Sequence, residues 1–365
     1  MVIVLSAFNG IEGIVENLYN SFDADIKITL NNGKTFPDAT IEKIKQSNTN
    51  HVEYICPVIE ETAIFKNGDV FATAKLKGVS NEFTKMIHLD SLLFDGYADV
   101  QHQGIEYCIP GVVLQSRLGV SANPKYDNII SVHGMLRTKK ISLTSTPYNK
   151  KPIQVGGVFM TGTPNDEKYV LCSIDFAKSL LEYKNELTAI EIGVDNENYI
   201  SQVKRDLKKV LGKDFQVKTK REQNQLIFSA TKNEKIATYI ILAFVLVISA
   251  FTLIASLTML VLEKRKDIST LFALGFDKSK IEKLFFTEGL LINFLGGVIG
   301  LFIGGLVCGL QIWFGLIPMD GMIVDSYPVQ VEIWDLVLII STVIVIGFIS
   351  SYFPVKYLIN KLELK

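Results

Sequence analysis

The sequence predicts an α-helical membrane protein that carries a large α+β domain outside the cytoplasm. The segments 236–262, 289–317 and 336–357 are apolar, and their only charged residue is Lys356. At 1.5 Å per residue, each segment is long enough to cross a hydrocarbon core about 30 Å thick. A charge at the bilayer centre costs about 2.5–3.5 kcal/mol. Three such segments in a chain that is 21% charged are therefore expected to be transmembrane helices.

Residues 1–18 are predicted to be the end of a further transmembrane helix. Met1–Phe8 is apolar but stops at Asn9-Gly10, so it is too short to span a bilayer. Unlike a secretory signal peptide, it has no basic n-region and no A-x-A-like cleavage site. We therefore expect that the first part of this helix is missing and that the complete protein has four spans. A short buried helix of the soluble domain is the alternative.

Residues 19–235 are predicted to form an α+β domain of two lobes. Asn31-Asn32-Gly33 and Lys66-Asn67-Gly68-Asp69 each follow a strand-like run and predict hairpin turns. Further strands are expected over 151–159, 169–172 and 189–194, and helices over 37–46, 111–118, 174–183 and 200–211. Because strands and helices alternate, we expect the chain to pass from one lobe to the other near Ile141.

No catalytic, metal-binding or nucleotide-binding motif is found in the sequence. The four histidines are at least 14 residues apart and form no H-E-x-x-H pair, and neither G-x-S-x-G nor G-x-x-x-x-G-K-[ST] occurs. Cys56, Cys108 and Cys172 form no C-x-x-C, so buried free thiols are expected, with one disulfide left open. The formal net charge of −1 does not indicate a nucleic-acid partner. We expect a non-enzymatic chain that itself binds no cofactor and no metal.

The charged residues between the spans predict the orientation. Segment 263–288 contains six Lys and Arg residues, and the tail 358–365 contains Lys361 and Lys365. The loop 318–335 contains Asp and Glu but neither Lys nor Arg. The positive-inside rule therefore predicts that 263–288 and 358–365 are cytoplasmic and that 19–235 lies on the other side of the membrane.

Segment 263–288 is also predicted to have a defined structure. The helix of the first complete span is expected to continue without a break to Asp267, and the segment then turns at Gly275. A short helix, 278–286, is expected to follow Asp277 as its N-cap. A solvated linker with snorkelling lysines is the alternative.

Within the span 289–317, glycines recur every four residues on one helix face. Such small residues let helix backbones approach closely in lipid, so we expect helix packing along this face. The three residues are Gly296, Gly300 and Gly304.

Residues 263–275, EKRKDISTLFALG, resemble the EKR-x-[DE]-I-x-x-L-x-A-L-G motif of FtsX-like and MacB-like ABC transporter permeases. More narrowly, nearly the whole chain is similar to the permease subunits of the lipoprotein-releasing system, the LolC and LolE type. The segments that carry this second resemblance are 4–10, 155–159, 222–235 and 351–355.

The resemblance implies a multi-pass subunit of the cell inner membrane with a MacB-like periplasmic domain. Such a subunit works with a cytoplasmic ABC ATPase, which binds ATP and Mg²⁺, and with a second permease copy or a paralogue. ATP-driven closure of the ATPase would be transmitted along the helices to release lipoprotein substrates to a periplasmic lipoprotein carrier. A MacB-like efflux permease, or an FtsX-like protein that activates a cell-wall hydrolase by transmembrane signalling, is the alternative.

We also expect particular residues of segment 263–288 to take part in this transmission. The residues expected to contact the ATPase are Asp267, Leu274, Gly275, Phe276 and Lys278. The side chains of Leu271, Phe272 and Phe285 are expected to pack against the segment's own helices.

Overall fold

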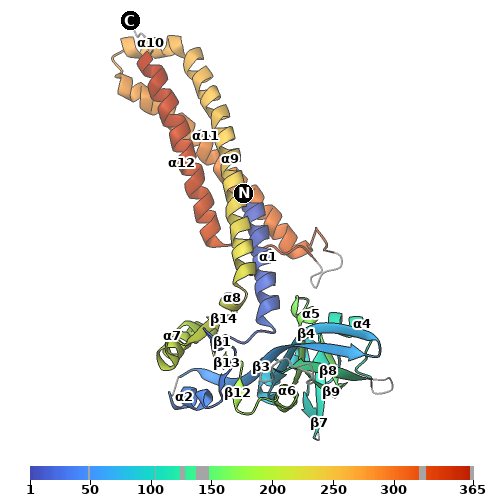
Figure 1. Cartoon of the computed structure of the whole chain (residues 1–365). Coiled ribbons are helices and arrows are strands. Elements are labelled where there is room, and N and C mark those ends of the chain that lie inside the picture. Colours follow the sequence, from blue (N-terminus) through green and yellow to red (C-terminus); the bar gives the residue numbers. More distant parts are fainter. Residues whose placement is uncertain (48–49, 103, 124–127, 137–147, 320–325, 362–365) are drawn as a thin grey trace, which may run out of the picture. The chain divides into compact units, whose positions relative to one another are not determined.

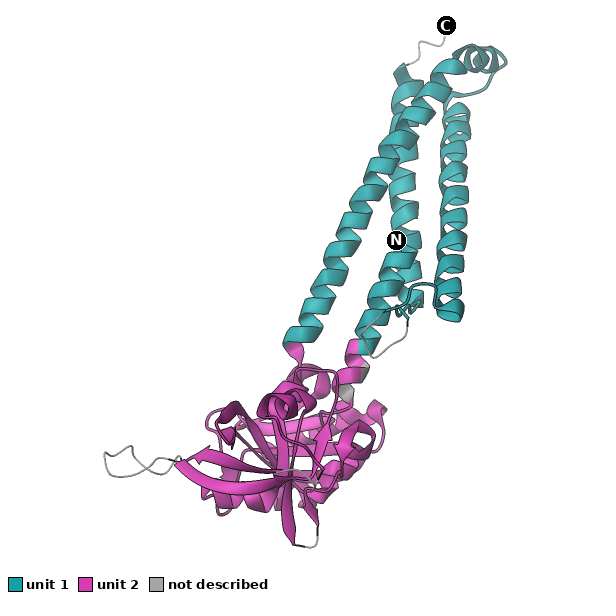
Figure 2. Cartoon of the chain, turned by 90° about the vertical axis from the view of Figure 1, so that its right-hand side faces the viewer, with its two compact units in different colours: residues 1–14, 226–365 teal, residues 15–225 magenta. Residues whose placement is uncertain are grey.

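The computed structural model describes residues 1–47, 50–102, 104–123, 128–136, 148–319 and 326–361, which form two compact units (Figure 2). The helical unit comprises residues 1–14 and 226–365, and the sheet unit comprises residues 15–225. Helix α1 (Val2–Asn20) runs from the first unit into the second, and helix α9 (Gln225–Glu263) begins at the other junction. The chain therefore passes between the two units twice, once within α1 and once at the start of α9.

The helical unit is built from long apolar helices (Figure 1). Besides α9 and the first part of α1 it contains α10 (Arg265–Ala273), α11 (Lys278–Phe314) and α12 (Ile333–Lys361). In the described part of the chain, α9, α11 and α12 have the length and composition to cross a membrane. Most of their large apolar side chains are exposed in the single chain, as expected for surfaces that face lipid or another subunit.

The first complete span does not continue unbroken to Asp267, so that prediction is wrong. Helix α9 ends at Glu263, Lys264 has φ −83° and ψ 9°, and α10 then turns across the end of the bundle (Figure 1). The turn buries Ile268 in an apolar cluster with Ile281 and Ile359. The expected short helix 278–286 is also not separate, because α11 runs without interruption through Phe314.

The sheet unit alternates strands with short helices. Its strands are β1 (Ile26–Leu30), β2 (Phe36–Pro37), β3 (Val52–Asn67), β4 (Val70–Val79), β5 (Leu93–Gly96), β6 (Gln101–His102), β7 (Ile105–Pro110), β8 (Ile129–Met135), β9 (Tyr148–Val155), β10 (Gly157–Phe159), β11 (Tyr169–Ser173), β12 (Glu186–Leu187), β13 (Ala189–Val194) and β14 (Phe215–Thr219). Its α-helices are α2 (Thr40–Gln46), α3 (Asn81–Met86), α4 (Val112–Leu118), α5 (Asn165–Lys168), α6 (Ile174–Leu181), α7 (Ile200–Leu211) and α8 (Lys220–Gln223), and the 3₁₀ turns are Leu89–Leu92 and Glu197–Tyr199.

One sheet connects the strands in the order β14-β1-β13-β3-β4-β11-β7-β9-β8. The β4–β11 and β7–β9 pairs are parallel, and the other pairs along this path are antiparallel. Strand β8 also pairs with β3, which closes β3, β4, β11, β7, β9 and β8 into a ring. We call this ring the barrel lobe and the remaining β1, β13 and β14, with α2 and α7, the open lobe (Figure 1).

The two lobes do not follow one another along the chain as expected. Strands β13 and β14 return to pair with β1 and β3, so the barrel lobe is inserted within the open lobe. The predicted passage near Ile141 lies outside the described residues. The predicted hairpin at Asn31–Gly33 is also wrong. Gly33 has the expected positive φ of 109°, but the strands that pair with β1 are β13 and β14, which come much later in the chain. The β3–β4 hairpin is confirmed, with Asn67 opposite Val70 and Gly68 at φ 56°.

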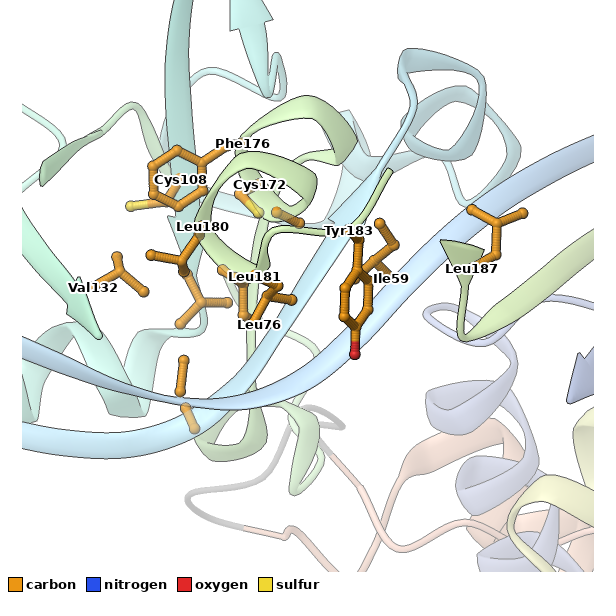
Figure 3. Close-up of a cluster of buried hydrophobic side chains, with 14 of the residues drawn as sticks. Ile59, Leu76, Cys108, Val132, Cys172, Phe176, Leu180, Leu181, Tyr183 and Leu187 are labelled. Atoms are coloured by element: carbon orange, nitrogen blue, oxygen red, sulfur yellow. The ribbon is translucent and has the colours of Figure 1, made fainter. Parts of the chain in front are cut away.

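The barrel lobe is filled by apolar side chains from α6 and from the ring of strands (Figure 3). The helix contributes Phe176, Leu180 and Leu181, which meet Leu76 of β4 and Val132 of β8. Each of these side chains is buried. Because α6 packs on β3, β4, β8, β9 and β11, which are five of the six strands of the ring, its burial stabilises the closed ring.

Candidate functional site

The turn between α10 and α11 forms an apolar tip, Leu274–Phe276. The N–H of Gly275 donates to the carbonyl of Phe272 at 3.0 Å, and the N–H of Phe276 donates to the carbonyl of Leu271 at 3.1 Å. These two bonds form a Schellman motif, which needs a left-handed residue after the helix. Gly275 supplies it with φ 92°. The backbone therefore fixes the direction in which Leu274 and Phe276 leave the helix.

The five residues expected to contact an ATPase are all exposed. Leu274 is 73% and Phe276 is 45% exposed, and the ammonium group of Lys280 lies 6.0 Å from the centre of the Phe276 ring. The fold brings Leu274, Gly275, Phe276 and Lys278 into one turn, whereas Asp267 lies earlier, on α10, and pairs with Lys264 at 3.2 Å. An exposed leucine and phenylalanine on a rigid turn have the character of a protein contact, and that contact stays a prediction.

A buried cluster supports the tip from below. Phe285 belongs to it as expected and Leu271 is half-buried, but Phe272 stays exposed, so the prediction is wrong for Phe272. The members that the sequence analysis missed are Leu257, Val261, Ile268, Ile281, Val355 and Ile359. The sequence did contain a signal for this cluster: α9, α11 and α12 each carry two of its apolar residues four positions apart, on one helix face. The cluster joins all three long helices to α10 through Ile268, and the tip follows directly at the end of α10.

The glycine face of α11 is only partly used within the chain. A Cβ on Gly304 would lie 3.0 Å from Val2, whereas a Cβ on Gly296 or Gly300 would meet nothing within 4 Å in the described part of the chain. The tight crossing of α11 and α12 lies elsewhere, where a Cβ on Gly289 would come within 2.6 Å of the hydroxyl of Ser351. Packing at Gly296 and Gly300 therefore stays a prediction.

A polar contact joins α1, α9 and α12 in the helical unit. The amide nitrogen of Asn9 is buried and donates to the Asp335 carboxylate at 2.7 Å and to the carbonyl of Gln330 at 3.2 Å. The same carboxylate accepts from the ammonium group of Lys235 on α9 at 3.1 Å. Gly10 lies directly under the backbone of Pro328, where a Cβ would be 2.3 Å from the carbonyl oxygen. These contacts explain why an Asn-Gly pair stands at this point of α1.

A second contact joins α1 to α8 within the sheet unit. The Arg221 guanidinium donates twice to the Glu16 carboxylate, from Nε and from an Nη atom, each at 3.0 Å. The Asn224 amide donates to the Asp23 carboxylate at 2.6 Å. The end of α1 and the segment that leads into α9 are therefore bound to each other.

Charged residues are buried where the two lobes meet. Lys77 on β4 is 2% and Glu191 on β13 is 1% exposed, and they pair at 2.9 Å. The Lys77 ammonium group also lies 4.3 Å from the centre of the Phe83 ring. Lys27 bridges Glu191 at 3.2 Å and Glu60 at 2.5 Å. The network spans β1, β13, β3 and β4, which are consecutive strands of the sheet.

The pKa values in this network favour the charged forms. Burial acts to raise the pKa of Glu191, but the Lys77 and Lys27 ammonium groups outweigh it and hold this pKa below its ordinary value of 4.5. The pKa of Glu60 is lowered in the same way, burial being outweighed first by Lys27. Burial opposes the charge of Lys27, yet Glu191 and Glu60 raise its pKa well above 10.5. Glu191, Glu60 and Lys27 are therefore charged at neutral pH.

Metal-ligating side chains do not gather within the described ranges. No group of three His, Cys, Asp or Glu residues there could hold a metal ion.

Comparisons with known proteins agree with the resemblance of residues 263–275. Residues 239–362 match the family described as FtsX-like permease C-terminal. Over 98% of its length, the chain is 25% identical to the lipoprotein-releasing system transmembrane protein LolC of Buchnera aphidicola, of which it covers 87%. It is 21% identical to LolE of Haemophilus influenzae, over 97% of this chain and 87% of that protein. The solved periplasmic region of MacB from Actinobacillus actinomycetemcomitans aligns with 59% of this chain and 97% of its own, at 15% identity and a TM-score of 0.39.

Proposed function

We propose that this chain, whose residues 239–362 form an FtsX-like permease domain, is the permease subunit of an ABC transporter that releases lipoproteins from the inner membrane. Its main support is the exposed tip, Leu274–Phe276, at the end of α10, a helix that the buried cluster joins to α9, α11 and α12. A motor subunit that binds the tip would move three spanning helices together. Similarity to LolC over nearly the whole chain favours lipoproteins as the cargo.

The proposed force path runs along the helices that lead into the sheet unit. Helix α9 has 39 residues, which corresponds to a rod of roughly 58 Å. Asp335 ties α9 to α1 through Lys235 and Asn9, and Arg221 ties the other end of α1 to α8 through Glu16. Because α1 is linked to α9 in the helical unit and to α8, which leads into α9, in the sheet unit, a push on the tip would reach the sheet unit through two coupled helices.

In this proposal, extraction of a lipoprotein from the membrane is driven by ATP that a partner ATPase binds. An acyl chain of about 16 carbons stabilises membrane anchoring by about 12 kcal/mol at about 0.8 kcal/mol per CH₂, and spontaneous escape is correspondingly slow. The sequence contains no G-x-x-x-x-G-K-[ST] loop, so we assign ATP and Mg²⁺ to a cytoplasmic ABC ATPase. A second permease, either another copy or a paralogue, and a periplasmic lipoprotein carrier complete the proposed complex.

We further propose that the sheet unit is periplasmic and that the tip and the C-terminus are cytoplasmic. Cysteine labelling tests this orientation, because all four native cysteines are buried and give a low background. Asp69→Cys and Lys280→Cys place thiols at exposed sites in the β3–β4 turn and on α11. In cells with a permeabilised outer membrane, an impermeant maleimide should label Asp69→Cys at once and Lys280→Cys only after the inner membrane is opened. The reverse pattern would rule out the orientation.

Depletion of the chain tests the cargo. Acylated proteins destined for the outer membrane should then accumulate in the inner-membrane fraction, measured by density-gradient separation and radiolabelled palmitate. Re-expression of the wild-type chain should restore their sorting. Normal sorting combined with drug sensitivity would instead favour a MacB-like efflux permease. Normal sorting with a division defect would favour an FtsX-like signalling protein.

A further inference from the structure

We infer that Cys108 and Cys172 form a redox pair that closes into a disulfide between the neighbouring strands β7 and β11 of the barrel lobe. Strands β7 and β11 are antiparallel, and their register places Cys108 directly opposite Cys172. Both thiols are free and buried in the structure. The other cysteine of the sheet unit, Cys56, lies on β3 opposite Glu191, so it belongs to a different place in the sheet.

The hydrogen bonds around the pair identify its type. The N–H of Gly111 donates to the carbonyl of Tyr169 at 3.3 Å, so these two opposed residues form a hydrogen-bonded pair. Opposed pairs alternate along an antiparallel ladder, and Cys108–Cys172 therefore falls on a non-hydrogen-bonded position. The carbonyl of Cys108 agrees with this, because it accepts from Gly156 at 3.0 Å, beside β9 rather than β11.

The spacing at such a position suits a disulfide. Opposed Cα atoms in a non-hydrogen-bonded pair are typically about 4.5 Å apart, and disulfides join Cα atoms separated by about 4.4–6.8 Å. The backbone therefore needs no movement, and each side chain turns about its Cα–Cβ bond. Figure 3 shows both thiols among the apolar side chains that surround Phe176 in the barrel core.

Burial decides when the bond can form. It raises the pKa of Cys108, and burial followed by the neighbouring Cys108 thiol raises the pKa of Cys172. Thiolate, the attacking species, is then scarce in the folded domain. We therefore expect oxidation while the strands are still forming and slow exchange afterwards. In cells this step depends on the proposed periplasmic location of the sheet unit, whereas the geometry of the pair does not.

The chemistry is ordinary thiol–disulfide exchange. The thiolate of one cysteine attacks a disulfide oxidant, such as oxidised glutathione, and releases one glutathione thiolate as a mixed disulfide forms. The second cysteine thiolate then attacks the mixed disulfide at the protein sulfur and releases the second glutathione. Two protein thiols are oxidised to one disulfide, the oxidant is reduced to two thiols, and the two protons pass to these thiols. The bond closes a loop of about 60 residues that contains β8 and β9.

Peptide mapping of the full chain in detergent tests the pair without reference to orientation. The reduced protein is incubated with oxidised glutathione in dilute urea, alkylated with N-ethylmaleimide, digested and analysed by mass spectrometry. We expect a reducible link between the Cys108 and Cys172 peptides, with Cys56 and Cys308 alkylated. The Cys56→Ser variant should keep this link, and Cys172→Ser should lose it. Alkylation of both Cys108 and Cys172 in the wild-type chain, or a link to Cys56 instead, would overturn the inference.

Two further measurements separate the pair from the proposed orientation and test its effect. If the link forms in detergent but is absent from protein alkylated inside cells, the pair stands and the periplasmic location fails. The rates at which a protease cleaves the oxidised and the reduced full chain show whether the disulfide stabilises the sheet unit. Reduction should speed cleavage within the sheet unit by on the order of 30-fold. Equal cleavage rates would contradict a stabilising role for the bond.

Discussion

Replacing Leu274 with Asp is expected to leave the chain in the membrane but to abolish its association with the ATPase. Leu274 is 73% exposed, so the fold does not depend on it. In a contact, the variant loses the burial of a leucine and must place a carboxylate in a desolvated interface. Together these effects should cost about 3–4 kcal/mol or more, which is at least a hundredfold in affinity.

Co-purification with the ATPase from detergent extracts measures this effect. Leu226 provides a matched control, because it is 88% exposed at the other end of α9 and receives the same Leu→Asp change. Leu226→Asp should retain the ATPase at wild-type yield. Gly275→Pro should behave like Leu274→Asp. Proline cannot adopt φ 92°, and it has no N–H to donate to the carbonyl of Phe272. Recovery of the ATPase with Leu274→Asp at the control level would refute the assignment of the tip.

Local signals in the sequence were sufficient for the membrane spans and for the tip. A charge-free run of about 20 residues has few alternatives to a transmembrane helix, because insertion energy is a sum over adjacent residues. Gly275 could likewise be read as a helix end because left-handed φ is a property of one residue. The β3–β4 hairpin belongs to the same class, since Gly68 and its neighbours determine it.

Contacts between distant residues could not be predicted in this way. Ile26 of β1 pairs with Ile192 of β13, and no local pattern indicates that the chain returns after more than 160 residues. The break at Lys264 is similar, because residues around it favour a continuous helix and the burial of Ile268 against Ile281 overrides them. Sequence patterns therefore gave the elements, whereas the lobe order depended on tertiary packing.

In the candidate site, too, local features could be predicted from the sequence and contacts between distant residues could not. The exposed face of the tip followed from a motif, but the cluster beneath it did not, since its members come from α9, α10, α11 and α12. Asn9 could be recognised as part of a resemblance, yet its partner Asp335 lies 326 residues away. Side chains that connect helices are therefore visible only once the helices are placed.

Replacing Glu191 with Ala is expected to destabilise the sheet unit by about 3–5 kcal/mol, because it leaves Lys77 buried without its counter-charge. The Lys77 ammonium group would keep its aromatic neighbours, but cation–π contacts contribute only about 1–2 kcal/mol. Hydrogen exchange of the full chain in detergent measures the effect, and amides of β4 and β13 should lose about 150-fold or more in protection. The matched control is Asp206→Ala, which removes the exposed partner of Lys209 and should change protection little.

The same network predicts how the sheet unit responds to acid. The pKa values of Glu60 and Glu191 are lower in the folded state than the ordinary 4.5, so the unfolded state binds more protons below neutral pH. Their stabilisation is complete above about pH 5.5 and is lost as the pH falls through 4.5 toward the folded-state pKa values. Glu191→Ala should therefore flatten the acid limb of protection measured against pH, whereas Asp206→Ala should preserve it. If Glu191→Ala kept both wild-type protection and the wild-type acid limb, the buried charges would not stabilise the sheet unit.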